Sequence, residues 1–200
     1  MPDFIYLASQ SPRRAQLLDQ LGISYRYLLP MPEDDAEALE LLLPGEAPAQ
    51  YVQRVTALKL DAAILRQQHR QLDPAPILCA DTTVALGTHI LGKPLDRADA
   101  LRMLGLLSGT VHEVFTALAI HSGARREALL SSSRVRFAAL NDAEIAAYVD
   151  TGEPFGKAGA YAVQGRAAAF IEYMEGSYSG IMGLPMHETA QLLRAVGFKL

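Results

Sequence analysis

The sequence contains little of what several classes of protein require. It has a single cysteine, Cys79, and no tryptophan among its 200 residues. One cysteine can form neither an internal disulfide nor a cysteine metal cluster, and its apolar neighbours indicate a small buried side chain. No apolar run approaches the roughly 18 residues that span a bilayer, and no basic-then-apolar leader begins the chain. These absences predict a cytoplasmic protein without a membrane partner.

Positive charge is also scarce. The chain has 18 lysines and arginines against 22 acidic residues, a net charge of −4, and no lysine- or arginine-rich block. Duplex nucleic acid requires an extended basic face, so we do not expect it as a partner. A small polyanion held by a local cluster of cations stays possible. Half of the residues are hydrophobic, and the length suits one domain over residues 1–200.

Residues 7–14, Leu-Ala-Ser-Gln-Ser-Pro-Arg-Arg, join a short apolar strand to the start of a helix. Ser11 is the expected N-cap, with Pro12 at the first helical position. The helix dipole repels Arg13 and Arg14 at this end. Free backbone N–H groups and two guanidinium groups there are typical of an anion site. The alternative is a solvated helix start with two surface arginines.

Residues 77–86, Ile-Leu-Cys-Ala-Asp-Thr-Thr-Val-Ala-Leu, read as a strand covered on both faces. Asp81 interrupts this apolar run with no glycine or proline beside it. An unpaired buried carboxylate is costly, so Asp81 should have a cation, a metal or a network of donors. We therefore favour a functional interpretation of Asp81 over a structural one.

The next segment, residues 87–94, fits the glycine and lysine spacing of a P-loop but lacks its other features. Pro94 stands where a P-loop has Ser or Thr, and the context is strand, tight turn, strand. The segment is predicted to be a hairpin with Lys93 at its rim, where the ammonium could reach a phosphate.

Two other segments have a functional and a bland interpretation. Residues 33–35, Glu-Asp-Asp, either form a solvated turn or supply oxygen ligands to a divalent cation. Residues 152–165 are rich in glycine. This segment is either a loop whose backbone approaches a ligand closely or a connector without such a role. In this loop Lys157, Tyr161 and Gln164 offer a charge, a ring and an amide that could read a base edge.

Apolar periodicity and turn residues predict the remaining elements. The predicted helices cover 48–69, 96–107 and 141–149 and a last one from 184 onward; the predicted strands cover 25–29, 111–121, 128–137 and 167–172, with a turn at 176–180.

Together these motifs resemble those of the Maf family of nucleoside triphosphate pyrophosphatases, over nearly the full length. The matching stretches are residues 7–14, Ala-Asp-Thr at 80–82, Gly-Lys-Pro at 92–94, Lys-Ala-Gly-Ala-Tyr-Ala-Val-Gln-Gly at 157–165 and Gly-Leu-Pro at 183–185. The resemblance implies an α/β fold with an elongated mixed sheet, surrounding helices and a cleft between two lobes. It also implies a homodimer and a divalent metal cation, Mg²⁺ or Mn²⁺.

The resemblance further implies hydrolysis of a nucleoside triphosphate to the monophosphate and pyrophosphate, in a house-cleaning role. It assigns Asp81 as general base or metal-site carboxylate. The family's selectivity positions fall on Arg13, Thr82 and Gln164, a combination similar to the branch acting on dTTP and UTP. The phosphate-binding candidates are Ser9, Arg14, Lys59, Lys93 and Lys157, and the metal candidates are Glu33 and Asp81.

Two positions depart from the family pattern, since Gly156 replaces the usual Asp before the lysine and Leu60 the usual Ala. Two alternatives stay open. One is a pyrophosphatase for other modified nucleotides such as 7-methyl-GTP, whose branch has Trp, Gln and Glu at the three selectivity positions. The other is a non-catalytic nucleotide-binding regulator. An intact Asp81 argues against the regulator, because a carboxylate beside a polyanion hinders simple binding.

Overall fold

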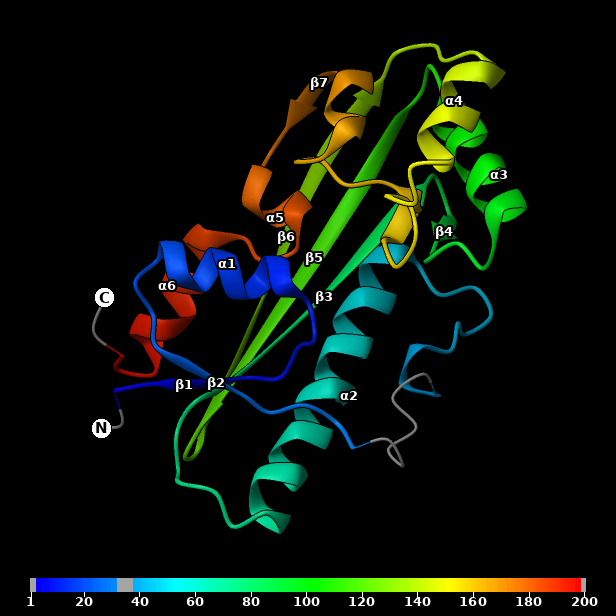
Figure 1. Cartoon of the computed structure of the whole chain (residues 1–200). Coiled ribbons are helices and arrows are strands. Elements are labelled where there is room, and N and C mark those ends of the chain that lie inside the picture. The colour runs from blue at the N-terminus through cyan, green and yellow to red at the C-terminus, as the bar shows by residue number, and fades with distance from the viewer. Residues whose placement is uncertain (1–2, 32–37, 199–200) are drawn as a thin grey trace.

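A computed structural model describes residues 3–31 and 38–198. Its central feature is a seven-stranded mixed sheet with the strand order β2-β1-β3-β5-β6-β7, in which β4 pairs with β3 (Figure 1). The strands are β1 (Ile5–Leu7), β2 (Tyr25–Tyr27), β3 (Ile77–Leu86), β4 (His89–Leu91), β5 (Val111–Ser122), β6 (Arg125–Phe137) and β7 (Ile171–Glu175). The α-helices are α1 (Pro12–Gln20), α2 (Pro48–His69), α3 (Arg97–Leu107), α4 (Asp142–Val149), α5 (Tyr178–Met182) and α6 (Met186–Ala195). Three short 3₁₀ helices are η1 (Ala38–Glu40), η2 (Ala158–Ala160) and η3 (Arg166–Phe170).

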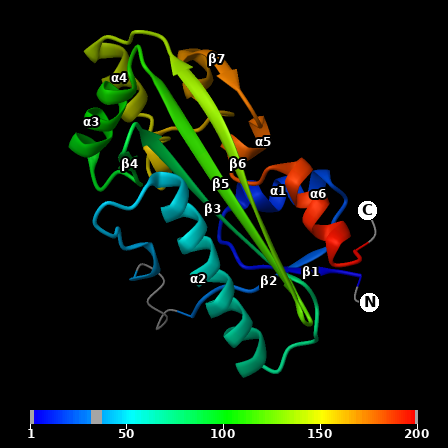
Figure 2. The same ribbon diagram turned by 180° about the vertical axis from the view of Figure 1, so that it is seen from behind.

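Different helices cover the two faces of the long strands. Figures 1 and 2 show α2 along one face of β3 and β5, with α1 and α6 on the opposite face. The alternation of β3 explains this arrangement, because successive side chains of a strand point to opposite faces. Ile77 and Cys79 pack with Leu60 of α2, whereas Leu78 packs in the core that contains Leu18 of α1.

One edge of β3 is left uncovered in its middle. On one side β5 pairs with β3 antiparallel from Ile77 to Ala85. On the other side parallel β1 reaches only Ile77 and Leu78, and antiparallel β4 begins at Val84. Within the described residues, 79–83 therefore have a strand neighbour on one side only. The loop from β1 to α1 lies beside this gap. Ligand-binding crevices commonly form at such a place, at the carboxyl ends of parallel strands.

The structure confirms most of the predicted elements, including the hairpin β3–β4 in place of a P-loop. Three predictions were wrong in detail. The strand predicted over 167–172 is η3 followed by β7, because a run of alanines carries little strand preference. The turn predicted over 176–180 includes the start of α5, where the Ser177 hydroxyl caps the Gly180 N–H. The second long hairpin strand begins at Arg125, three residues before the predicted 128.

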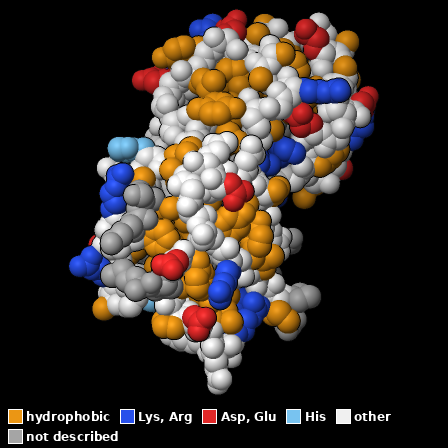
Figure 3. Space-filling model, turned by 60° about the vertical axis from the view of Figure 1, so that its left-hand side comes forward, with side chains coloured by type: hydrophobic (Ala, Val, Ile, Leu, Met, Phe, Trp, Pro, Cys, Tyr) orange, Lys and Arg blue, Asp and Glu red, His pale blue; other side chains and the backbone are white. Residues whose placement is uncertain are grey.

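The charged side chains do not form one basic surface on the face that Figure 3 displays. There, lysines and arginines are interspersed with acidic side chains. No helix in the described part of the chain is both long enough and apolar enough to cross a bilayer.

Candidate active site

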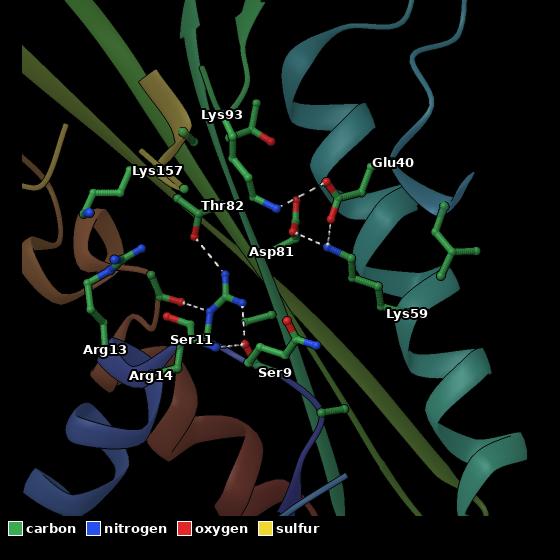
Figure 4. Close-up of a pocket in the computed structure, with 18 of the residues that line it drawn as sticks. Ser9, Ser11, Arg13, Arg14, Glu40, Lys59, Asp81, Thr82, Lys93 and Lys157 are labelled. Carbon is green, nitrogen blue, oxygen red and sulfur yellow. Dashed lines mark hydrogen bonds and ion pairs between the residues drawn. The ribbon is translucent and has the colours of Figure 1, made fainter. Parts of the chain in front are cut away.

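A cleft of about 1600 Å³ opens beside the uncovered edge of β3. It is lined by residues 8–14 of the β1–α1 connection, 80–84 of β3, parts of α2, the end of β4, the 156–164 segment and residues 181–183. Figure 4 shows polar side chains from these elements converging on the edge of β3. The sequence motifs, which are spread along the whole chain, therefore meet at one place.

Two adjacent polar residues of β3, Asp81 and Thr82, face opposite sides of the sheet. Asp81 points toward α2, where its Oδ1 accepts a hydrogen bond from Lys59 at 2.6 Å. Thr82 points toward α1, where its hydroxyl accepts one from Arg14 at 3.2 Å. The alternation of a strand thus divides the cleft into an α2 side and an α1 side that meet at the edge of β3.

Beside β3, on the α2 side, two lysines meet two carboxylates. The Lys59 ammonium bridges Asp81 and Glu40, at 2.6 and 2.7 Å. Lys93, at the rim after β4, lies 3.8 Å from the second oxygen of Glu40 and is 63% exposed in its side chain. The Asp81 side chain is only 14% exposed, and a carboxylate this buried needs a partner. Lys59 is that partner, one of the kinds of partner that the sequence analysis expected.

Glu40 is a member of the site that the sequence analysis missed. Burial alone would raise the pKa of Glu40, but the bond to Lys59 and the charges of Lys93 and Arg14 outweigh it and lower that pKa. The backbone carbonyl of Glu40 accepts a hydrogen bond from the Tyr51 hydroxyl at 2.9 Å, which ties η1 to α2. Burial and the charges of Asp81 and Glu40 raise the pKa of Tyr51 to about 12, so this phenol keeps its donor proton.

On the α1 side, Arg14 connects three elements. Its Nε donates to the Gly183 carbonyl at 2.7 Å, its Nη1 to the Ser9 hydroxyl at 2.9 Å and its Nη2 to the Thr82 hydroxyl at 3.2 Å. Burial is the main influence on the Arg14 guanidinium and lowers its pKa, while the charge of Asp81 raises it. Arg14 therefore holds the cleft walls together as well as supplying charge.

Ser9 retains a proton for a ligand. Its Oγ accepts from Arg14 at 2.9 Å and from the Ser11 N–H at 3.2 Å. A hydroxyl has two acceptor lone pairs and one donor proton, so both lone pairs are occupied. Ser11 does stand at the predicted N-cap position of α1, but its side chain makes no capping bond. The start of the helix keeps backbone N–H groups that no preceding turn can satisfy.

The Thr82 hydroxyl belongs to a chain of hydrogen bonds with a defined direction. Thr116 on β5 donates to the Gly180 carbonyl at 2.8 Å. Its single proton is thereby used, so the 2.9 Å contact between the two threonines requires Thr82 to donate to Thr116. Thr82 in turn accepts from Arg14. The Thr82 hydroxyl therefore fixes the guanidinium of Arg14 and has only acceptor capacity left for a ligand.

Two further cations face each other across the α1 side. Arg13 donates from Nε to the Met182 carbonyl at 3.3 Å, and Lys157 donates to the carbonyl of Glu153 at 2.5 Å. Neither has an ion-pair partner among the described residues. Burial lowers the pKa of both, and the charge of Arg13 lowers that of Lys157 further. An anion bound between them would relieve this repulsion.

The remaining candidates are placed only in part. Gln164 lines the cleft with an exposed side chain. Glu33 lies outside the described residues, so its predicted metal role stays a prediction.

The described residues contain no group of three or more metal-ligating side chains. Asp81 and Glu40 nevertheless share one ammonium, and no described residue forms a hydrogen bond or ion pair with Asp81 Oδ2. Two hard carboxylates with oxygen capacity suit Mg²⁺ or Mn²⁺, which keep several waters and take substrate phosphate oxygens.

The fold and the site together define an α/β protein with a cleft for a small polyanion. Seven lysine and arginine side chains and the start of α1 line it, and the carboxylates among the described lining residues, Glu40 and Asp81, lie on the α2 side. A family model described as Maf-like protein matches residues 4–196. The chain belongs to the Maf family.

Curated relatives extend over the whole chain. This chain is 63% identical over 200 residues to a protein of Albidiferax ferrireducens named dTTP/UTP pyrophosphatase, and the alignment covers 100% of both chains. It is also 63% identical to a protein of the same name from Polaromonas sp., covering 99% of this chain and 98% of the other. A third, from Cupriavidus pinatubonensis, is 61% identical and covers 97% of each chain.

Among solved structures, the Ham1 protein of Staphylococcus aureus aligns with a TM-score of 0.41 and 13% identity. That alignment covers 67% of this chain and 71% of that chain. A likeness at this TM-score supports no conclusion.

Proposed function

We propose that this protein is a nucleoside triphosphate pyrophosphatase that hydrolyses dTTP and UTP to the monophosphate and pyrophosphate. The observation that carries the proposal is the 63% identity, over the full length of both chains, to a relative named dTTP/UTP pyrophosphatase. The chemistry of the cleft supports it. A triphosphate carries about four negative charges, and phosphoryl transfer needs them neutralised by positioned cations and metal.

The phosphates are proposed to bind along the edge of β3. Arg13 and Lys157 are without ion-pair partners among the described residues and lie on the α1 side, where an anion is most needed. The free Ser9 proton and the backbone N–H groups at the start of α1 complete a set of donors suited to phosphate oxygens. On the α2 side, Lys59 and Lys93 can add their ammonium groups, which Glu40 engages in this structure.

The metal is proposed to lie on the α2 side. Asp81 and Glu40 would hold it, and Glu33 stays a further predicted ligand. A divalent cation bound there would neutralise phosphate charge and polarise the phosphoryl oxygen.

Asp81 is the proposed general base. Lys59 fixes Oδ1 of Asp81, so the other oxygen is oriented and available to take a proton from water. The water oxygen bonds to one phosphorus atom of the α–β linkage, the bridging oxygen leaves with the other phosphorus, and the proton passes to Asp81. One monophosphate and one pyrophosphate result.

Base selection is proposed to rest on Arg13, Thr82 and Gln164. The Gln164 amide offers both a donor and an acceptor to a pyrimidine edge. Because the Thr82 proton is committed to Thr116, Thr82 can act on a ligand only as an acceptor, for example from an N–H. Its other role is to hold Arg14.

The proposal is tested by pyrophosphate release from a panel of triphosphates with Mg²⁺ or Mn²⁺. We expect dTTP and UTP to be hydrolysed well above the purine triphosphates and 7-methyl-GTP, and Asp81→Asn to lose the activity. Preferential turnover of 7-methyl-GTP would retain the enzyme and refute the selectivity assignment. Nucleotide binding without turnover of any triphosphate would favour the regulator.

Three further proposals follow from the sequence and the family rather than from the site. They are a homodimer, a cytoplasmic location and a single domain over residues 1–200. Sedimentation equilibrium of the purified protein tests the first, fractionation of the source cells the second, and a single cooperative unfolding transition the third.

A further inference from the structure

One carboxylate outside the catalytic cluster closes the loop that carries Lys157 and Gln164. Glu153 stands at the start of this loop, and its Oε2 accepts a hydrogen bond from the Arg166 N–H at 3.0 Å, at the loop's other end. Its Oε1 accepts from the Tyr148 hydroxyl at 2.9 Å and lies 3.5 Å from the Ala167 N–H. Three donors from two segments thus meet on one side chain.

The same residue also restrains Lys157. The Lys157 ammonium donates to the backbone carbonyl of Glu153 at 2.5 Å. Gln164 lies two residues before Arg166, whose N–H is bound by the Glu153 carboxylate. Lys157 and Gln164 are therefore both tied to Glu153, Lys157 directly and Gln164 through the backbone.

Gly165 makes room for this contact. A Cβ added at Gly165 would lie 2.2 Å from Oε1 of Glu153 and 2.7 Å from Oε2. The backbone at Gly165 has φ −102°, outside the left-handed region that favours glycine. A side chain is thus excluded here by the carboxylate itself and not by the backbone conformation.

Glu153 is held in its charged form. Burial raises the pKa of Glu153, but the Arg166 N–H, the Tyr148 hydroxyl, the Ala167 N–H and the charge of Lys157 outweigh it and lower that pKa. A carboxylate can only accept hydrogen bonds, and the Tyr148 hydroxyl and the Arg166 and Ala167 N–H groups all donate to this one.

We propose that Glu153 is a positioning residue for base selection: its carboxylate fixes the 152–166 loop so that Gln164 meets the base and Lys157 meets the phosphates. This inference rests on the proposed function, because it takes Gln164 and Lys157 to contact the triphosphate. It assigns to Glu153 a role in selectivity rather than in the chemical step.

The test compares Glu153→Gln, Glu153→Ala and Gly165→Ala with the wild type. The readouts are kcat/KM for dTTP relative to dATP and the amide hydrogen exchange of Arg166 and Ala167. We expect Glu153→Ala to lower the dTTP/dATP ratio by about tenfold to a hundredfold, since small misplacements of contacting groups have effects of this size. Glu153→Gln retains one acceptor oxygen and should fall between. Both backbone amides should exchange faster in Glu153→Ala.

Gly165→Ala provides an independent approach to the same contact. Its Cβ should displace the carboxylate and reproduce the loss of selectivity, and in the Glu153→Ala, Gly165→Ala double variant the two effects should not add. The matched control is Glu144→Ala, because Glu144 also accepts a backbone N–H, that of Asn141 at 2.8 Å in the capping box of α4, but does not line the cleft. It should lower stability and leave the dTTP/dATP ratio unchanged.

The outcomes separate this inference from the proposed function. A wild type without preference for dTTP would refute the function and the inference that rests on it. A selective wild type with an unchanged ratio in both Glu153→Ala and Gly165→Ala would refute the role of Glu153 alone. An equal loss of selectivity in Glu144→Ala would also refute it, because general destabilisation would then explain the effect.

Discussion

Lys59 is the residue whose removal the structure predicts most specifically. Its ammonium bridges Asp81 and Glu40 in a part of the cleft where it is 21% exposed. Lys59→Met keeps most of the aliphatic stem and removes only the charge. Two carboxylates are then left without their shared ammonium, while Lys93 stays 3.8 Å from Glu40.

The magnitude follows from the number and burial of the lost bonds. A hydrogen bond to a charged group contributes about 1.5–3 kcal/mol. The bond to Asp81 should count nearly in full, and the bond to Glu40, which is 34% exposed, much less because solvent screens it. We expect Lys59→Met to lower the free energy of unfolding at pH 7 by about 2–4 kcal/mol. For a chain of this size that corresponds to a fall in Tm of about 5–15 °C.

Lys93→Met is the matched control. It removes the same kind of charge from the same cluster, but Lys93 is 63% exposed and its contact to Glu40 is 3.8 Å long. An exposed ion pair of that kind contributes about 0–1 kcal/mol. Urea denaturation of both variants measures the difference directly. An equal effect of the two substitutions would refute the bridging role of Lys59.

The effect of Lys59→Met should also depend on pH in a defined direction. The pKa of Glu40 is lowered in the folded protein, so its ion pair stabilises the fold above the ordinary glutamate value and ceases to do so as pH falls through the folded value. The difference between wild type and Lys59→Met should therefore be largest near pH 7 and shrink below about pH 4. A difference that grows in acid would contradict the ion pair.

Three further predictions concern buried groups. Thr116→Val keeps the side-chain shape but removes the acceptor for Thr82, so it should lower the free energy of unfolding, measured by urea denaturation, by about 1–3 kcal/mol. It should also raise KM, because Thr82 then holds Arg14 less well, and an unchanged KM would refute the hydrogen-bond chain. Burial lowers the pKa of His112 to about 4, so between about pH 6.5 and 4 the unfolded chain binds a proton at this imidazole that the folded chain does not. The free energy of unfolding should therefore fall by up to about 3 kcal/mol over this range, and His112→Leu should reduce that pH dependence. Burial raises the pKa of Cys79 to about 12, so the native protein should not react with a thiol reagent at pH 8, whereas the unfolded chain should react with one equivalent.

The sequence analysis predicted the elements that have a clear period and the residues that interrupt one. Asp81 was identified because a carboxylate within an apolar strand needs a partner, and the structure supplies Lys59. The convergence of distant motifs on one cleft came from the family resemblance. It could not be worked out from periodicity, which says nothing about which elements meet.

Glu40 and Thr116 were missed because their significance lies in contacts with other segments of the chain, and Glu153 because the hydrogen bonds by which it closes its loop leave no sequence pattern. Glu40 stands in a short 3₁₀ turn with no apolar period, and only the bonds to Tyr51 and Lys59 bring it into the cleft. Thr116 is one of many small residues in a long strand. Its role follows from a hydrogen-bond direction that only coordinates reveal.

Ser11 shows the opposite limit. Its position as N-cap was predicted correctly, because serine before proline is typical of a helix start. The expected capping bond is absent among the described contacts. The Ser11 N–H donates instead to Ser9, whose hydroxyl also accepts from Arg14. The sequence pattern thus located the start of the helix correctly but did not predict the hydrogen bonds that Ser11 and Ser9 form there.

We propose above that the protein hydrolyses a triphosphate between its α- and β-phosphates at the edge of β3, with Asp81 as the base. Phosphorus NMR of dTTP hydrolysis with Mg²⁺ tests it most directly, with wild type and Asp81→Asn in parallel. We expect dTMP and pyrophosphate as the first products, and a rate about 10²–10⁴-fold lower in the variant, as for loss of a general base. Release of dTDP and orthophosphate, or full turnover by Asp81→Asn, would contradict it.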